Sequence, residues 1–245
     1  MKIKSPLVNK NEVKLLCEAG ADELFCGIEP YGWRRSYKDF CINQRSTGAN
    51  FTKLADLEKA ISIAHKYKTK VHITMNAFFY LEEQYERAKQ IIEDVLDTGA
   101  DGIIFADPAL LLNIDNGLLK AKDVVMGTDA VIFNSSAVKF YKRLGSTRVV
   151  LPRAMTINEI KEIIRDDKCM EYEAFIIHDL CFFVDGFCTY CKEGSGEIKR
   201  EGKERKKISF FSASRIYQRG FSGGCRARFR GQKIFFRNNR QTGPL

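Results

Sequence analysis

Alternation of short strand-like segments with longer helix-like segments constrains the fold of this chain more than any other feature. Apolar runs of four to seven residues are separated by segments in which apolar side chains recur with helical spacing. This order predicts parallel strands joined by right-handed helical crossovers. The expected strands are 22–28, 70–75, 101–106, 124–127, 148–151 and 173–177, and the expected helices are 9–19, 53–67, 81–97, 135–144 and 157–165.

A repeated phrase supports this reading of the chain. Residues 19–25 (AGADELF) and 98–104 (TGADGII) each place a glycine after a helix-like segment and a strand after the glycine. Glycine suits the left-handed conformation that commonly ends a helix. The phrase therefore predicts one helix–turn–strand unit used at least twice. Elsewhere, Thr156 and Glu159 have the spacing of a capping box, which predicts the start of helix 157–165.

About six such units favour an α/β fold of the (β/α) barrel type, complete or incomplete and TIM-like. An open doubly wound sheet is the alternative, and no GxGxxG follows the first strand, which excludes the usual dinucleotide-binding form. In either fold the chemistry lies at the carboxyl ends of the strands. Candidates there for binding a small anionic co-substrate are Tyr31, Trp33, Arg34, Arg35, Asn76, Asp107, Asp129, Asn134 and Arg153.

Arg153 is the favoured residue of that group, because a guanidinium binds carboxylates through two parallel hydrogen bonds. An ion pair with Asp129 or Asp107 is the structural alternative.

The C-terminal part of the chain differs in charge from the rest. Residues 192–245 carry 15 Lys and Arg against 4 Asp and Glu, whereas residues 1–191 carry 25 against 27. We therefore expect a barrel-like domain over 1–191, a flexible charged loop over 192–207 and a basic, aromatic appendage over 208–245. Arginines contact phosphates and aromatic rings stack on exposed bases, so the appendage indicates RNA binding, with a solvated surface as the alternative. The RNA-binding candidates are Arg215, Arg219, Arg226, Arg228, Arg230, Phe235 and Arg237.

Neither a membrane span nor a secretion signal is expected. No apolar run approaches the ~20 residues that a spanning helix needs, and the N-terminus lacks an apolar signal region. We therefore expect a cytoplasmic protein. In that compartment clustered cysteines are more often metal or redox sites than disulfides. Cys17 and Cys26 are expected to be small buried apolar residues instead.

The segment 173–191, EAFIIHDLCFFVDGFCTYC, holds three of the eight cysteines. Cys181 and Cys188 are seven residues apart, Cys191 forms a CxxC pair with Cys188, and Cys225 stands alone further on. Structural zinc sites usually contain two closely spaced cysteine pairs. The wider spacing therefore favours an iron–sulfur cluster, with structural thiols as the alternative.

The same segment resembles the signature of the collagenase-like peptidase family U-32, which matches Glu173, Phe175, Cys181, Gly186 and Cys188. Gly224 and Cys225, with Arg230 after them, resemble the family's next block. AGADELFCG, GANFT (48–52) and VVLPRAMTINEI (149–160) resemble its N-terminal units. The resemblance implies a modified barrel and a 4Fe-4S cluster. It also implies a role in oxygen-independent hydroxylation of transfer RNA, ribosomal RNA or the ubiquinone ring.

The resemblance also implies a set of ligands. Cys181, Cys188 and Cys225 are the expected cluster ligands. Cys41 is the expected fourth ligand, and the alternatives are Cys191, a residue beyond Leu245 or a residue of a protein partner. Three residues depart from the family pattern: His178 replaces a usual Gly, Phe229 a frequent Cys, and Ala154 a common Glu.

The catalytic candidates are Arg153, His178 and Asp129. Peptide hydrolysis, which the family name suggests, is the alternative function. The chain has neither HExxH nor GxSxG, and His178 beside Cys181 is the one nucleophile–base pair that the sequence offers. His65 and His72 are expected to be surface or packing residues. A third hypothesis is an accessory iron–sulfur subunit that works in a complex.

Overall fold

The computed structural model describes residues 1–37, 40–45, 47–115, 117–176 and 185–186. Its strands form one parallel sheet in the order β1-β2-β4-β5-β6-β7-β8, with the short β3 also paired to β2. The strands are β1 (Lys4–Pro6), β2 (Glu23–Ile28), β3 (Asn50–Phe51), β4 (Lys70–Met75), β5 (Gly102–Phe105), β6 (Asp123–Met126), β7 (Arg148–Val150) and β8 (Glu171–Glu173). The α-helices are α1 (Val13–Glu18), α2 (Tyr31–Ser36), α3 (Leu54–Lys66), α4 (Tyr85–Asp97), α5 (Pro108–Leu112), α6 (Ser135–Arg143) and α7 (Ile157–Asp166).

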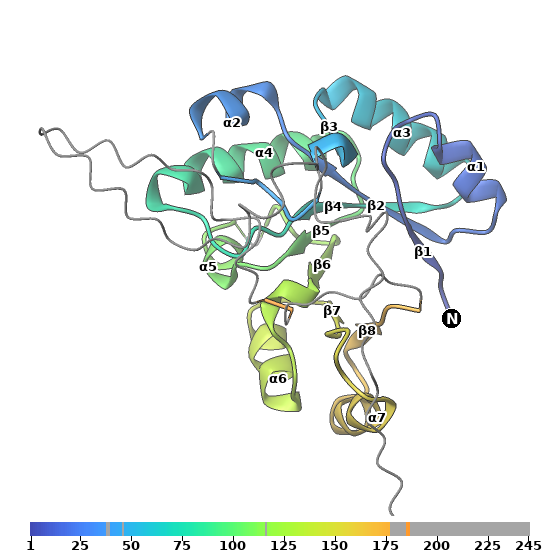
Figure 1. The fold of residues 1–245 in the computed structure, drawn as a ribbon, viewed down its shortest axis with the longest axis vertical. Coiled ribbons are helices and arrows are strands. Elements are labelled where there is room, and N and C mark those ends of the chain that lie inside the picture. The colour runs from blue at the N-terminus through green and yellow to red at the C-terminus, as the bar shows by residue number, and fades with distance from the viewer. Residues whose placement is uncertain (38–39, 46, 116, 177–184, 187–245) are drawn as a thin grey trace, which may run out of the picture.

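The sheet curls into a half-barrel with the helices on its outer side (Figure 1). The expected TIM-like α/β fold is therefore confirmed in its incomplete form. In the described part of the chain, β1 and β8 are the two ends of the strand order, and no backbone ladder joins them.

The main core lies between the sheet and the helices. It contains fully buried side chains of α3 such as Leu57 and Ala60, and of α4 such as Ile92 and Val95, packed on the outer side chains of the strands. A second, smaller cluster joins Ile104, Val125 and Val150 with Phe25. These four residues come from β5, β6, β7 and β2, and they fill the inside of the curl.

The repeated phrase has a clear physical basis. Gly20 and Gly99 both have a positive φ, +97° and +93°, directly after α1 and α4. The aspartate that follows each glycine accepts a backbone N–H from the neighbouring strand segment. Asp22 Oδ2 lies 2.7 Å from Ile3 N, and Asp101 Oδ2 lies 2.8 Å from Val71 N. The phrase thus encodes both the turn and the attachment of the next strand.

Three expectations about elements are corrected. The last described strand is Glu171–Glu173, not 173–177, and the apolar side chains of Phe175 and Ile176 that suggested a strand are exposed. Strand β1 was not expected, because three residues that include a lysine and a proline give no apolar pattern. The first helix covers only Val13–Glu18, within the expected 9–19.

No helix in the described ranges is both long enough and apolar enough to cross a membrane. The capping box is confirmed, because Thr156 N donates to Glu159 Oε2 over 2.7 Å and Glu159 N donates back to Thr156 Oγ1.

Candidate functional site at the mouth of the half-barrel

Side chains on the inner face of the sheet form three layers of different chemistry. The strands begin at a charged floor, which includes Glu23, His72 and Arg148. The middle layer is apolar and contains the cluster around Ile104 and Val125. The carboxyl ends of the strands carry polar residues again, and this polar end is the mouth at which sites occur in barrels of this type.

Asn76, directly after β4, connects two parts of the mouth. Its Oδ1 accepts a hydrogen bond from Gln44 N at 3.2 Å, and its Nδ2 donates to Asp129 Oδ2 at 3.2 Å. Asp129 follows β6 and also accepts a hydrogen bond from the backbone N–H of Gly186. Residues from the loops after β2, β4 and β6 are thereby joined to residues 185–186.

Arg153, the favoured anion-binding residue, makes its ion pair with Asp185. The backbone N–H of Arg153 donates to Asp185 Oδ2 at 2.7 Å, and its Nε donates to Asp185 Oδ1 at 2.9 Å. This partner is a third aspartate, and the Arg153 charge also acts on Asp129, one of the two expected partners, by lowering the pKa of its carboxyl. Asp185 is 4% exposed, and sequence reasoning missed it. Its position next to the signature residue Gly186 was the available signal.

Burial, and after it the negative charge of Asp185, raise the pKa of Asp129, and the net pKa is about 6. The Gly186 N–H, the Arg153 guanidinium and the Asn76 amide act in the opposite direction. A carboxyl with a pKa near neutrality can accept or release a proton under physiological conditions, which is what a general acid or base requires. Asp129 therefore remains a catalytic candidate on geometric and electrostatic grounds.

Several other mouth candidates have structural roles. Trp33 is fully buried, and its Nε1 donates to the Phe40 carbonyl oxygen at 2.8 Å. Asp107 and Asn134 cap α5 and α6 by accepting hydrogen bonds from Ala109 N and Ala137 N. Arg34 forms two hydrogen bonds with Glu29. Tyr31 and Arg35 are exposed on α2.

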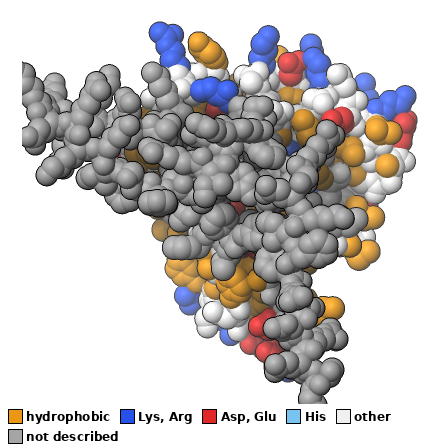
Figure 2. Space-filling view, in the orientation of Figure 1, with side chains coloured by type: hydrophobic (Ala, Val, Ile, Leu, Met, Phe, Trp, Pro, Cys, Tyr) orange, Lys and Arg blue, Asp and Glu red, His pale blue; other side chains and the backbone are white. Residues whose placement is uncertain are grey.

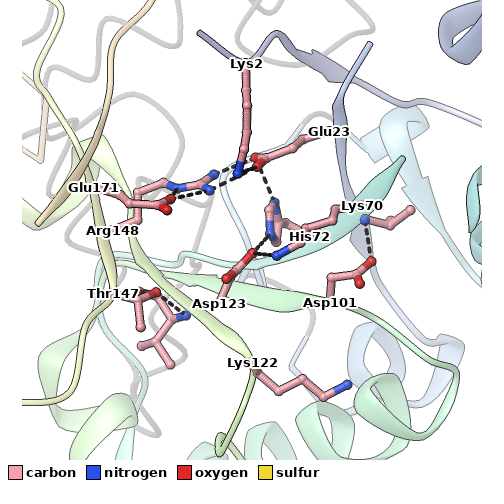
Figure 3. Close-up of polar contacts among 12 residues, drawn as sticks. Lys2, Glu23, Lys70, His72, Asp101, Lys122, Asp123, Thr147, Arg148 and Glu171 are labelled. Carbon is pink, nitrogen blue, oxygen red and sulfur yellow. Dashed lines mark hydrogen bonds and ion pairs between the residues drawn. The ribbon is translucent and has the colours of Figure 1, made fainter. Parts of the chain in front are cut away.

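The floor of the half-barrel is an ionic network that the sequence did not reveal (Figure 3). Arg148 of β7 donates to Glu23 of β2 at 2.5 and 3.0 Å and to Glu171 of β8 at 2.7 Å. His72 of β4 lies between Asp123, 2.9 Å from its Nε2, and Glu23, 3.6 Å from its Nδ1. His72 is thus a buried packing residue, as expected, and it belongs to this network.

The same network joins the two ends of the sheet. Lys4 Nζ of β1 lies 2.7 Å from Glu173 Oε2 of β8 and 3.6 Å from Glu23 Oε2. Side-chain ion pairs therefore connect β1 and β2 to β7 and β8 across the inside of the curl, where no backbone pairing is described. Glu23 and Arg148 are 2% and 6% exposed, so this central pair is shielded from water, whereas the Glu171 side chain is 60% exposed.

Four of the cysteines lie in the described residues. Cys26 is buried and Cys17 is partly buried against the core, which confirms their structural roles, while Cys41 and Cys169 are exposed. Groups of three or more His, Cys, Asp or Glu side chains able to hold a metal ion do not occur in this part of the chain. The predicted ligands Cys181, Cys188, Cys191 and Cys225 lie outside the described residues, as do His178 and every predicted RNA-binding residue.

Asp129→Asn should stabilise the folded protein at neutral pH. The unfolded chain releases this proton near pH 3.8 and the folded chain near pH 6, so ionised Asp129 destabilises the fold above pH 6. We expect the free energy of unfolding to rise by about 1–3 kcal/mol at pH 7.5 and the difference from wild type to vanish below about pH 4. Urea denaturation at both pH values measures this. The exposed Asp166→Asn is the control, and a gain that is independent of pH would contradict the argument.

A parallel (β/α) half-barrel with an acidic, amide-rich mouth defines a TIM-like α/β protein. The chain belongs to peptidase family U32, whose model matches residues 8–203. This finding confirms the resemblance that the cysteine signature carried. The solved structure of the U32 peptidase Mk0906 superimposes with a TM-score of 0.51 at 15% identity, covering 71% of this chain and 68% of that one.

Curated relatives include proteins of RNA modification. The tRNA hydroxylation protein P1 of Bacillus subtilis (strain 168) is 29% identical over 76% of this chain and 40% of its own length. The 23S rRNA 5-hydroxycytidine C2501 synthase of Escherichia coli (strain K12) is 26% identical over 75% of this chain and 25% of its own length. The chain therefore spans less than half the length of these relatives.

Proposed function

We propose that this chain takes part in the hydroxylation of transfer or ribosomal RNA, in an iron–sulfur-dependent form of the reaction. One structural observation carries the proposal beyond the names of its relatives. Residues 185–186, which lie between Cys181 and Cys188 in the sequence, both contact the mouth. Asp185 binds Arg153, and Gly186 donates to Asp129. The segment that holds Cys181 and Cys188 is therefore attached at the end of the half-barrel where barrel enzymes react.

The chain length between these contacts and the cysteines supports a cluster near the mouth. Cys188 follows Asp185 by three residues, so their Cα atoms are at most about 11 Å apart. Cys41 is exposed, and its thiol is close enough to the Arg34 guanidinium to interact with it electrostatically. Positive charge of this kind favours the thiolate that an iron–sulfur cluster needs.

The proposed ligands are Cys181, Cys188 and Cys225, with Cys41 or Cys191 as the fourth. A bound 4Fe-4S cluster would supply one-electron chemistry at the mouth. Arg153 and Asp185 then position the segment that contains the cysteines. Asp129 holds a proton that it can exchange.

RNA binding is assigned to the basic C-terminal residues. On the face that Figure 2 shows, the described Lys and Arg side chains are interspersed with acidic and apolar ones. The excess of positive charge lies in residues 192–245, which carry 15 Lys and Arg against 4 Asp and Glu. A local positive potential of this kind attracts a polyanion such as RNA.

Binding of transfer RNA by the anaerobically reconstituted protein should fall steeply with salt. A footprint of about six phosphates loses roughly three orders of magnitude in affinity between ~50 and ~200 mM salt, because bound counterions are released. Arg226→Ala and Arg228→Ala should each flatten the slope by about one unit, and the exposed Arg143→Ala of α6 should not. Mass spectrometry of the RNA nucleosides then tests hydroxylation directly.

RNA that is neither bound at ~50 mM salt nor hydroxylated would overturn the proposal. Cleavage of a collagen-like peptide that survives removal of iron would favour the peptidase alternative instead. The described histidines give that alternative little support. His65 bonds to Asp101 and His72 lies in the floor network, and both positions are at the end of the half-barrel opposite the mouth. Hydroxylation that requires a second protein would favour the accessory-subunit hypothesis.

A further inference from the structure

In the part of the chain that the structure describes, two amide atoms at the mouth are buried without a hydrogen-bond partner. They are Gln44 Nε2, a donor, and Asn50 Oδ1, an acceptor. A buried polar atom without a partner is unfavourable, and folded proteins contain few of them. An unpaired donor and an unpaired acceptor at the candidate site are therefore a reason to look for a ligand that pairs with both.

The backbone around these amides is arranged to make room for them. Asn50 begins β3 and lies beside Gly27 near the carboxyl end of β2. A side chain at position 27 would collide with Asn50 Oδ1 and approach Asn43 Nδ2 to 2.8 Å. Gln44 is fixed by the hydrogen bond from its backbone N to Asn76 Oδ1, the residue that also bonds to Asp129. Gln44 is thus connected to the residues of the candidate site, and the pairing of Asn50 with Gly27 places Asn50 at the same end of the sheet.

The carboxyl groups of the mouth disfavour an anion at these amides. Asp129 and Asp185 place two carboxyl groups nearby, and Arg153 forms its ion pair with Asp185. Arg45 donates to the carbonyl oxygens of Ala49 and Leu7. A neutral, planar ligand that presents both a donor and an acceptor fits this setting better than a phosphate or a carboxylate.

The hydrogen-bonding edge of a nucleobase has that chemistry. Asn and Gln side chains pair with base edges because an amide offers a donor and an acceptor in one plane. Enzymes that modify a base in RNA bind it unstacked, with its Watson–Crick edge exposed to the protein.

We propose that Gln44 and Asn50 form the subsite that binds the edge of the target base, an inference that rests on the proposed RNA substrate. Gln44 Nε2 donates to a carbonyl oxygen or ring nitrogen of the base, and Asn50 Oδ1 accepts from a base N–H. The phosphates are bound elsewhere, by the basic residues. The subsite therefore determines which base is accepted and contributes little to the salt-dependent part of RNA affinity.

The test compares two single-stranded RNA oligonucleotides that differ in one central nucleotide, a uridine or cytidine in one and an abasic site in the other. Binding to the full, reconstituted chain is measured for wild type, Gln44→Met and Asn50→Leu. Wild type should prefer the base-bearing RNA, and each substitution should reduce that preference about fivefold, the effect of one hydrogen bond. Affinity for the abasic RNA should not change. Gln90→Met, an exposed amide on α4, is the matched control.

Thermal unfolding provides a readout that is independent of RNA. If Gln44 Nε2 and Asn50 Oδ1 are kept unpaired for a ligand, apolar replacements should leave the melting temperature unchanged or raise it by about 2–4 °C. A preference for the base that survives both substitutions, or a wild type that binds both oligonucleotides equally, would overturn the subsite. Hydroxylation that continues unchanged in both variants would also overturn it while leaving the proposed function intact. Loss of base preference without any hydroxylation by wild type would support the subsite and count against the proposed function.

Discussion

Gly186→Ala should remove most of the iron from the reconstituted protein while the half-barrel stays folded. Gly186 has a φ of +83°, a backbone conformation that residues other than glycine rarely adopt. Its Cα also lies so close to Val131 that a Cβ would collide with that side chain and lie 2.9 Å from the carbonyl oxygen of Asp129. An alanine therefore forces residues 185–186 away from the mouth, together with Cys188 two residues later.

A second glycine with a similar φ separates the effect of backbone strain from the effect of the close approach to Val131 and Asp129. Gly145 has a similar φ of +93°, but no atom lies within 4 Å of the position of its Cβ. Gly145→Ala should lose about 1 kcal/mol of stability through backbone strain alone and keep its iron. Cys188→Ser should lose iron like Gly186→Ala, and Cys17→Ser should not. Iron and sulfide are measured after anaerobic reconstitution. Equal iron in the Gly186 and Gly145 variants would show that the close approach at Gly186 is not needed for the cluster.

Gly186 also shows that a sequence signature can be recognised before the structural reason for its residues is known. The glycine of the Gly-x-Cys pattern is required by its contact with Val131, which lies 55 residues earlier in the chain. The features that the sequence predicted correctly were local: the capping box at Thr156, the glycines after α1 and α4, and the apolar runs of the central strands. Each depends on residues within one or two helical turns.

The features that sequence reasoning missed depend on distant pairs. Arg148 and Glu23 are 125 residues apart, and Arg153 and Asp185 are 32 apart. No local pattern distinguishes a charged residue that faces the inside of a barrel from one that faces water. The end of the sheet was misplaced for a related reason, since the apolar run after Glu173 resembled a strand more than Glu171–Glu173 did. That polar strand is tolerated because Arg148 and Lys4 pair with its glutamates.

Arg148→Met should destabilise the protein by about 3–5 kcal/mol at pH 7, because it leaves buried Glu23 without its main counter-charge. In the folded protein the Arg148 hydrogen bonds and the charges of Arg148, His72 and Lys4 outweigh burial and lower the pKa of Glu23 to about 2. Ionised Glu23 therefore contributes stability that is fully present above its unfolded pKa of about 4.5 and is lost as the pH falls toward 2. Without Arg148 the pKa of Glu23 rises, so that contribution disappears.

The difference between Arg148→Met and wild type should consequently be largest at neutral pH and shrink below about pH 4, as Glu23 becomes protonated in the variant. Adding Glu23→Gln to Arg148→Met should restore part of the lost stability at pH 7, because no buried carboxylate then remains without a partner. Urea denaturation measures all three proteins, with the exposed Arg143→Met as the control for loss of an arginine. A loss of less than about 1 kcal/mol for Arg148→Met, the range of a surface ion pair, would mean that the floor network does not join the two ends of the sheet.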